Sequence, residues 1–184
     1  MNFRVLVGIS AVIAPFLHLL SDLIEWFQGG FSTGQLWLNY IAFLPMPWLL
    51  LGVCVLHDPK PGWVALTGAL LYGAAFTYFS HTTLVALEQH VVSYEVLWAG
   101  LGSIYTLHGA LMVCGGLMFG FSALRAGWLP RASLLLFIFG LTLNFLLALL
   151  PTPDIFQISC SAVRNIGLMS MGYAILLKQL QLRG

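Results

Sequence analysis

Ionisable side chains lie inside the apolar segments of this sequence, where each of them needs a partner or a wet cavity. His18, Ser21, Asp22 and Glu25 recur three or four positions apart, so a helix places them on one stripe of its surface. A charged side chain at the centre of a membrane helix costs about 2.5–3.5 kcal/mol. We therefore expect this stripe to face other helices rather than lipid.

Three further apolar segments carry polar residues at a similar depth. His81 lies in the third segment, His108 in the fourth, and Ser161 with Arg164 in the sixth. An arginine inside a membrane needs a counter-charge, and the acids of the first stripe are the nearest to it in depth. These groups either satisfy one another or line a polar pocket that opens to one side of the membrane. The second interpretation predicts a ligand-binding pocket formed by His18, Asp22, Glu25, His81, His108 and Arg164.

Imidazole and carboxylate groups also bind metals, which adds two cofactor hypotheses. His18, Asp22 and Glu25 could offer ligands to a transition metal from one helix face, and His81 with His108 could hold a b-type haem between two helices. The sequence contains no H-E-x-x-H, C-x-x-C or paired H-x-x-x-H motif, so no particular metal is indicated. It also contains no G-x-S-x-G nucleophile motif. The pattern therefore favours a binding protein over an enzyme.

The elements that must position these residues are six apolar segments, each long enough to cross a bilayer. A membrane helix needs about twenty apolar residues. Of the 184 residues, 60% are hydrophobic and only 7% are charged, which is too few charges to cover a soluble domain. Backbone groups in lipid must be satisfied internally, which requires helices here. We predict one all-α domain with spans at residues 3–27, 35–56, 63–89, 94–126, 128–150 and 154–182.

Two of these spans carry features that disturb a straight helix. The second contains Pro45-Met46-Pro47, and each proline removes a helix hydrogen bond, so we expect either a packed kink or a broken helix of the kind that coordinates ions in transporters. The fourth is longer than a membrane requires, and we expect it to tilt or protrude. His57 follows the second span in a turn and is predicted to be solvated.

Basic and acidic residues separate along the chain. With six spans, the loops on one side and the two termini hold six of the seven basic residues, which are Arg4, Lys60, Arg125, Arg131, Lys178 and Arg183. The positive-inside rule predicts that this side and both termini are cytoplasmic. All the acidic residues except Asp58 belong to the outer half, and they are Asp22, Glu25, Glu88, Glu95 and Asp154. An acidic outer vestibule favours cations.

These observations predict a small multi-pass protein of a bacterial cell (inner) membrane, whose outward-facing pocket binds or transports a small cationic or amphipathic molecule. Two alternatives stay open. The chain could be a haem- or metal-binding redox subunit, or an accessory subunit of a larger membrane complex or homo-oligomer. No run of Lys and Arg resembles a nucleic-acid patch or a polybasic lipid-binding segment. The lipid bilayer is the one partner that the composition requires.

Overall fold

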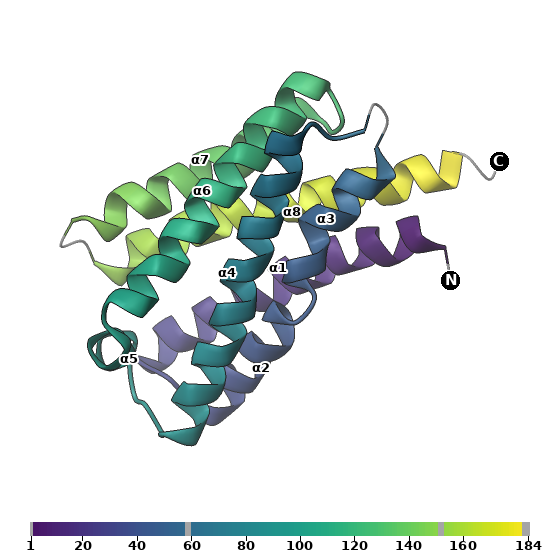
Figure 1. The fold of residues 1–184 in the computed structure, drawn as a ribbon. Helices are drawn as coiled ribbons and strands as arrows, with labels where there is room; N and C mark the ends of the chain where they lie inside the picture. The colour runs from purple at the N-terminus through teal and green to yellow at the C-terminus, as the bar shows by residue number, and fades with distance from the viewer. Residues whose placement is uncertain (1, 58–59, 151–152, 182–184) are drawn as a thin grey trace.

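The long helices of this protein lie side by side in one bundle, as the computed structural model shows (Figure 1). The structure describes residues 2–57, 60–150 and 153–181. Within them, six spans are long and apolar enough to cross a membrane, which confirms the predicted number. The helices are α1 (Phe3–Gln28), α2 (Thr33–Phe43), α3 (Met46–Leu56), α4 (Trp63–Glu88), α5 (Tyr94–Leu101), α6 (Ser103–Ala126), α7 (Arg131–Ala148) and α8 (Asp154–Gln181).

The second span is interrupted at its proline pair, where the sequence predicted either a packed kink or a broken helix. Helix α2 ends at Phe43 and α3 begins at Met46. Pro45 lies in the turn between them, and its carbonyl oxygen accepts a hydrogen bond from the backbone N–H of Trp48 at 3.2 Å. The carbonyl oxygen of Pro47 lies against Gly73 of α4, where an added Cβ would be only 2.8 Å away. This contact favours a packed kink.

The fourth span differs from its prediction. The expectation of one helix over residues 94–126 was wrong, because the chain breaks at Gly102, which has a φ of 54° and a ψ of −129°. A positive φ is strained for residues with a Cβ but not for glycine. Of the two helices on either side of this break, α6 is long and apolar enough to span a membrane and α5 is not. Helix α5 lies at the end of the bundle away from the chain termini (Figure 1).

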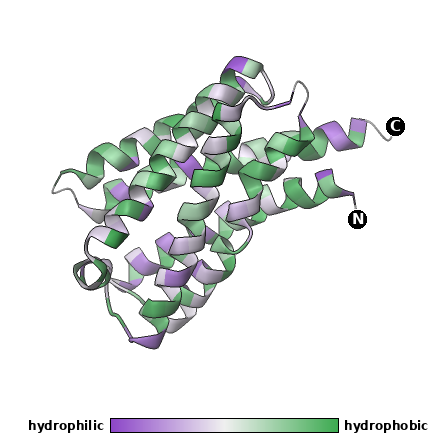
Figure 2. Cartoon of the chain, viewed as in Figure 1, coloured by the Kyte–Doolittle hydropathy of each residue, from purple (hydrophilic) through white to green (hydrophobic). Residues whose placement is uncertain are grey.

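Small residues set how closely the helices approach one another. The most extensive contacts join α1 to α8, α4 to α6 and α7 to α8. At the α4–α6 contact, a Cβ added to Gly115 would lie 2.5 Å from the backbone nitrogen of Tyr72 and 2.7 Å from the carbonyl oxygen of Gly68. Hydrophobic residues cover most of the length of the long helices (Figure 2). This combination of close backbone contact and apolar outer surface is typical of membrane bundles.

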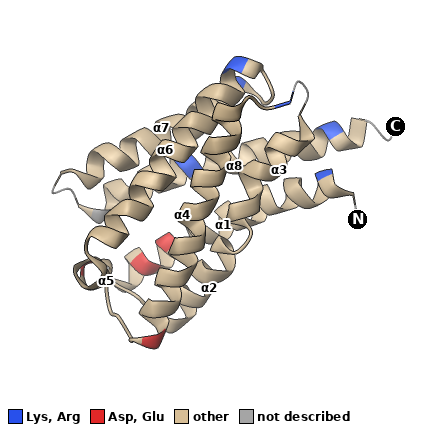
Figure 3. Cartoon of the chain, viewed as in Figure 1, with Lys and Arg blue, Asp and Glu red and all other residues tan. Residues whose placement is uncertain are grey.

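Charges of opposite sign occupy opposite ends of the bundle. Figure 3 shows basic residues gathered at the end that holds both termini, apart from one in the interior, and acidic residues toward the other end. Arg4, Arg125 and Lys178 lie in terminal turns of α1, α6 and α8. Arg183, Asp58, residue 182 and the side chain of Asp154 lie outside the described residues. We call the two ends the basic end and the acidic end.

His57 at the basic end is buried, so the prediction that it is solvated was wrong. Its side chain is 7% exposed, its Nδ1 lies 2.8 Å from the carbonyl oxygen of Val53, and its ring stacks on Trp128 at 5.8 Å. Burial lowers the pKa of His57 below its ordinary value of 6.5, and the nearby charges of Lys178 and Arg4 lower it further. The turn after α3 is therefore packed onto the turn after α6.

Candidate functional site

The centre of the bundle holds a buried arginine that is shared by several helices. Arg164 of α8 is 3% exposed. Its Nη2 donates to Ser161 Oγ at 3.1 Å and lies 3.4 Å from Nδ1 of His18 on α1. Its Nη1 donates to the sulfur of Met112 on α6 at 3.2 Å. Three helices thus meet around one guanidinium group.

Asp22 supplies the negative charge of this network without touching the arginine. Ser161 Oγ donates to Asp22 Oδ2 at 2.7 Å, and Nε2 of His18 lies 3.4 Å from Asp22 Oδ1. His18 can therefore accept from Arg164 at Nδ1 and donate to Asp22 from Nε2 while remaining neutral. The network balances one positive against one negative charge, with His18 and Ser161 as bridges between them.

A second group of polar side chains adjoins this network on α1. Gln35, at the start of α2, donates from Nε2 to Ser21 Oγ at 2.9 Å and to Glu25 Oε2 at 3.3 Å. Ser21 Oγ donates in turn to the carbonyl oxygen of Gln35 at 3.3 Å. The predicted stripe of α1 therefore does face other helices: His18 and Asp22 join the network on α8, whereas Ser21 and Glu25 contact α2.

Aromatic rings gather between α4, α5 and α6 at the acidic end. His108 of α6 stacks on Tyr78 with ring centroids 4.5 Å apart, and its edge contacts include Phe79 and Tyr105. Tyr105 also packs edge-on against Tyr94 of α5 at 5.3 Å. Among the described residues, neither ring nitrogen of His108 has a hydrogen-bond partner, although both atoms are buried. Such orphaned groups are rare and call for an explanation.

Two of these rings are within electrostatic range of the carboxylates of α1. Tyr105 is within electrostatic reach of both Glu25 and Asp22, and Tyr94 is within reach of Glu25. Asp22 retains limited exposure, with 16% of its side chain accessible. The acidic end therefore combines the α1 carboxylates with a group of aromatic rings.

The structure brings together some of the six predicted residues and leaves one apart. His18, Asp22 and Arg164 share one network, and Glu25 adjoins it through Gln35 and Ser21. His108 lies in the aromatic group, within electrostatic reach of His81. The side chain of His81 itself is exposed on α4.

Several contributors were missed or undervalued at the sequence level. Gln35 was placed at the end of a span, where polar residues are usually solvated, and Met112 has no polar signature. Tyr105 was recognised beside His108 in the fourth segment, whereas Tyr94 was considered only as the first residue of that segment. Ser161 was recognised on the stripe of Arg164 but not as the bridge to Asp22.

No protein-family model, curated protein or solved structure matches this chain. The chemistry of the site is therefore argued from its own geometry.

That geometry does not favour a metal centre. Within residues 2–57, 60–150 and 153–181, no three His, Cys, Asp or Glu side chains come close enough to hold a metal ion. Of the proposed set, His18 and Asp22 face each other, whereas Glu25 turns toward Gln35. A metal centre at these three residues would need a different arrangement of α1 and α2.

A haem between His81 and His108 is a poor fit for a different reason. An axial ligand must present a free ring nitrogen to the iron. Both ring nitrogens of His108 are covered by surrounding protein atoms, and the ring face lies on Tyr78. His81 is exposed on the outer side of α4. These two histidines do not form an axial pair in this fold.

Proposed function

We propose that this protein binds a small organic cation in the acidic half of the bundle, as the first step of transporting or sensing it. The observation that carries the proposal is that the α1 carboxylates act electrostatically on two tyrosines of the aromatic group, Glu25 on both Tyr94 and Tyr105 and Asp22 on Tyr105. Carboxylates and aromatic faces are the two groups that attract an organic cation most strongly. Neither group alone would indicate a ligand.

The arginine network supports this assignment because its charges determine how deep in the bundle a cation can bind. Asp22 is the acid of the network that also acts on Tyr105, and its Oδ1 has one partner among the described residues, His18 at 3.4 Å. It therefore has the capacity to accept a further donor or cation. Arg164 lies deeper and repels a second positive charge, so a ligand is held above it. In the absence of ligand, the guanidinium serves as the internal counter-ion of Asp22.

The test uses tetraphenylphosphonium as an amphipathic cation and the purified full chain in detergent micelles. The variant R164M/D22N keeps the net charge of the protein while removing the carboxylate and its internal counter-ion together. We expect saturable binding to the wild type and binding at least about 30-fold weaker to the variant, because losing one side of a desolvated charge contact costs 2–5 kcal/mol. Equilibrium dialysis measures both.

The matched control is E88Q/E95Q, which neutralises two exposed acids of the same end. Its affinity should stay within about twofold of the wild type, since exposed charges contribute little. Equal weakening in both variants would mean that the cation responds only to general surface charge, and an absence of saturable binding to the wild type would refute the proposal outright.

We also propose that the basic end and both termini face the cytoplasm of a bacterial cell, with the chain in the inner membrane. The support is the charge asymmetry, since loops near the cytoplasm carry an excess of Lys and Arg. A fluorescent protein fused after Gly184 should fluoresce, whereas alkaline phosphatase fused there should be inactive. The reverse pair of results would place the acidic end inside and would require the cation to approach from the cytoplasm.

A further inference from the structure

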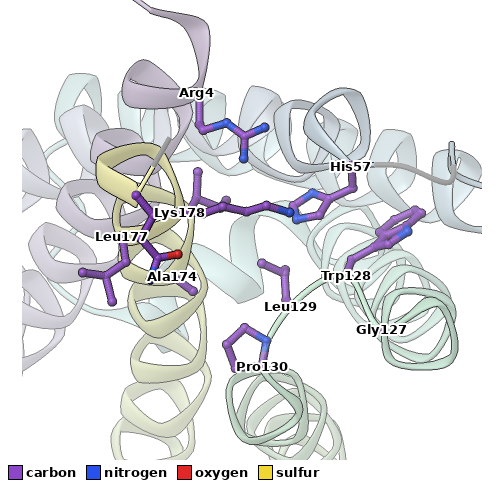
Figure 4. Close-up of a pocket in the computed structure, with 11 residues that line it drawn as sticks. Arg4, His57, Gly127, Trp128, Leu129, Pro130, Ala174, Leu177 and Lys178 are labelled. Carbon is purple, nitrogen blue, oxygen red and sulfur yellow. The ribbon is translucent and has the colours of Figure 1, made fainter. Parts of the chain in front are cut away.

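A cavity of about 480 Å³ opens at the basic end, between the start of α1, the end of α8 and the turns after α3 and α6. Figure 4 shows Arg4 and Lys178 on one side of it and Trp128, Leu129 and Pro130 on the other. The Lys178 side chain extends across the cavity toward the His57 ring (Figure 4). This cavity is separate from the cation site, which lies at the opposite end of the bundle.

The charge of the cavity is positive. Arg4 and Lys178 come from opposite ends of the sequence, and both act electrostatically on His57. Within the described residues, neither forms an ion pair with a carboxylate, and the Nη1 of Arg4 is buried without a hydrogen-bond partner. Asp58 and residues 182–184 are neighbours in sequence of the lining residues His57 and Gln181, and they lie outside the described residues. Two cations facing one cavity repel each other unless an anion lies between them.

The walls combine this charge with apolar and aromatic surface. Trp128 is 9% exposed and its Nε1 is buried without a partner in the described part of the chain. Leu129, Pro130 and Leu177 add further apolar surface to the lining. A guanidinium fork matches the oxygens of a phosphate group, and an ammonium group adds a point charge. Basic pockets between membrane helices at the cytoplasmic surface bind lipid head groups in this way.

We propose that this cavity binds a phosphate group, carried either by an anionic phospholipid or by free phosphate. Its volume lies within the range of small-molecule sites, and its place at the end of the spans puts it at the depth of lipid head groups. No stretch of the chain is rich in basic residues, so this site could not be predicted from the sequence. Folding brings Arg4 and Lys178 together through the packing of α1 on α8 and the hydrogen bond from Asn2 Nδ2 to Gln179 Oε1 at 3.2 Å.

The two lysines of the chain, Lys60 and Lys178, allow the proposal to be tested. Lys178 reports on the cavity, and Lys60 serves as the reference. Lys178 lines the cavity, whereas Lys60 is an exposed residue that does not. Amine acylation of the full-length protein, followed by mass spectrometry of each site, measures how fast each lysine reacts. We expect an occupant of the cavity to slow acylation of Lys178 and to leave Lys60 unchanged.

Two arms distinguish the source of the phosphate. One compares micelles doped with phosphatidylglycerol or with phosphatidylcholine, and the other compares inorganic phosphate with chloride at equal ionic strength, without phospholipid. Protection by phosphatidylglycerol alone identifies a head-group site, and protection by inorganic phosphate identifies a site for phosphate itself. If neither probe protects Lys178, or if both lysines are protected equally, the proposal is overturned.

Variants test whether the cavity, rather than surface charge, is responsible. A basic residue near an anionic group contributes about 1 kcal/mol, or about fivefold in affinity. We expect R4Q to need about five times more of the effective probe to protect Lys178, while R131Q, which removes a charge at the same end but outside the cavity, should stay within about twofold. Equal effects of R4Q and R131Q would refute the site. The wild-type result decides the question if R4Q does not fold.

Discussion

Replacing Arg164 by methionine is expected to lower the free energy of unfolding by about 3 kcal/mol, because the change leaves the mostly buried carboxylate of Asp22 without its counter-charge. The single change D22N should cost a similar amount, since it strands the guanidinium instead. Ser161 and His18 connect the two groups at 2.7–3.4 Å, and the hydroxyl of Ser161 cannot replace a missing charge.

The double variant R164M/D22N should be much more stable than the sum of the two losses predicts. Removing both charges leaves no stranded ion, and a coupling energy of roughly 2–3 kcal/mol is expected for groups in one network. Titration with a denaturing detergent in mixed micelles measures the free energy of unfolding of the wild type, of each single variant and of the double variant. The control R131M, at an exposed position of the basic end, should change stability by less than about 0.5 kcal/mol. Additive losses would show that Asp22 does not balance Arg164.

This cycle also separates the fold from the proposed function. If the charge network serves the fold alone, the double variant restores stability and no cation binding is lost, since none exists. If Asp22 also anchors a ligand, the double variant is stable and has lost binding. A stable protein without binding is therefore the signature of a functional site, and R164M/D22N can display it where D22N alone would confuse unfolding with loss of affinity.

The sequence predicted the charged and titratable members of the network, His18, Asp22 and Arg164, but not the hydrogen bonds that connect them. The cost of charge in lipid implied that Arg164 must meet an acid of α1, and the spacing of His18 and Asp22 placed them on one face. That the contact runs through Ser161 depends on the register of α1 against α8. Small residues set this register: a Cβ added to Gly172 would lie 2.7 Å from the Cβ of Ala11. Such close packing follows from shape and cannot be derived from charge spacing.

The different positions of His81 and His108 also follow from close packing at a small residue, in this case Gly115. His81 comes nine positions after Tyr72, which at about 100° per residue puts it on the opposite side of α4. Tyr72 is fully buried and packs against Gly115, so His81 faces outward. His108 comes seven positions before Gly115 and therefore shares its buried face. Their similar depth in the membrane suggested that the two histidines were equivalent. The face of each helix that packs closely at Gly68 and Gly115 would have distinguished them.

The glycine contact between α4 and α6 leads to the second large expected effect. Changing Gly115 to alanine should lower the free energy of unfolding by about 1–3 kcal/mol. The added Cβ would meet the backbone of Tyr72 and Gly68 at 2.5 and 2.7 Å, and backbone atoms cannot rotate away as a side chain can. The two helices must therefore separate, which also shifts the ring of Tyr72 and its neighbour Phe137.

Gly109, one and a half turns earlier in the same helix, provides the matched control. No atom lies within 4 Å of a Cβ added there, so G109A should be neutral or stabilising by up to about 1 kcal/mol, because glycine weakens a helix relative to alanine. The same unfolding titration in mixed micelles measures both variants. A loss of stability in G109A equal to that in G115A would mean that any alanine in α6 disturbs the protein. In that case the close approach at Gly68 and Gly115 would not be what fixes α6 against α4, and the placement of His108 that depends on it would lose its physical basis.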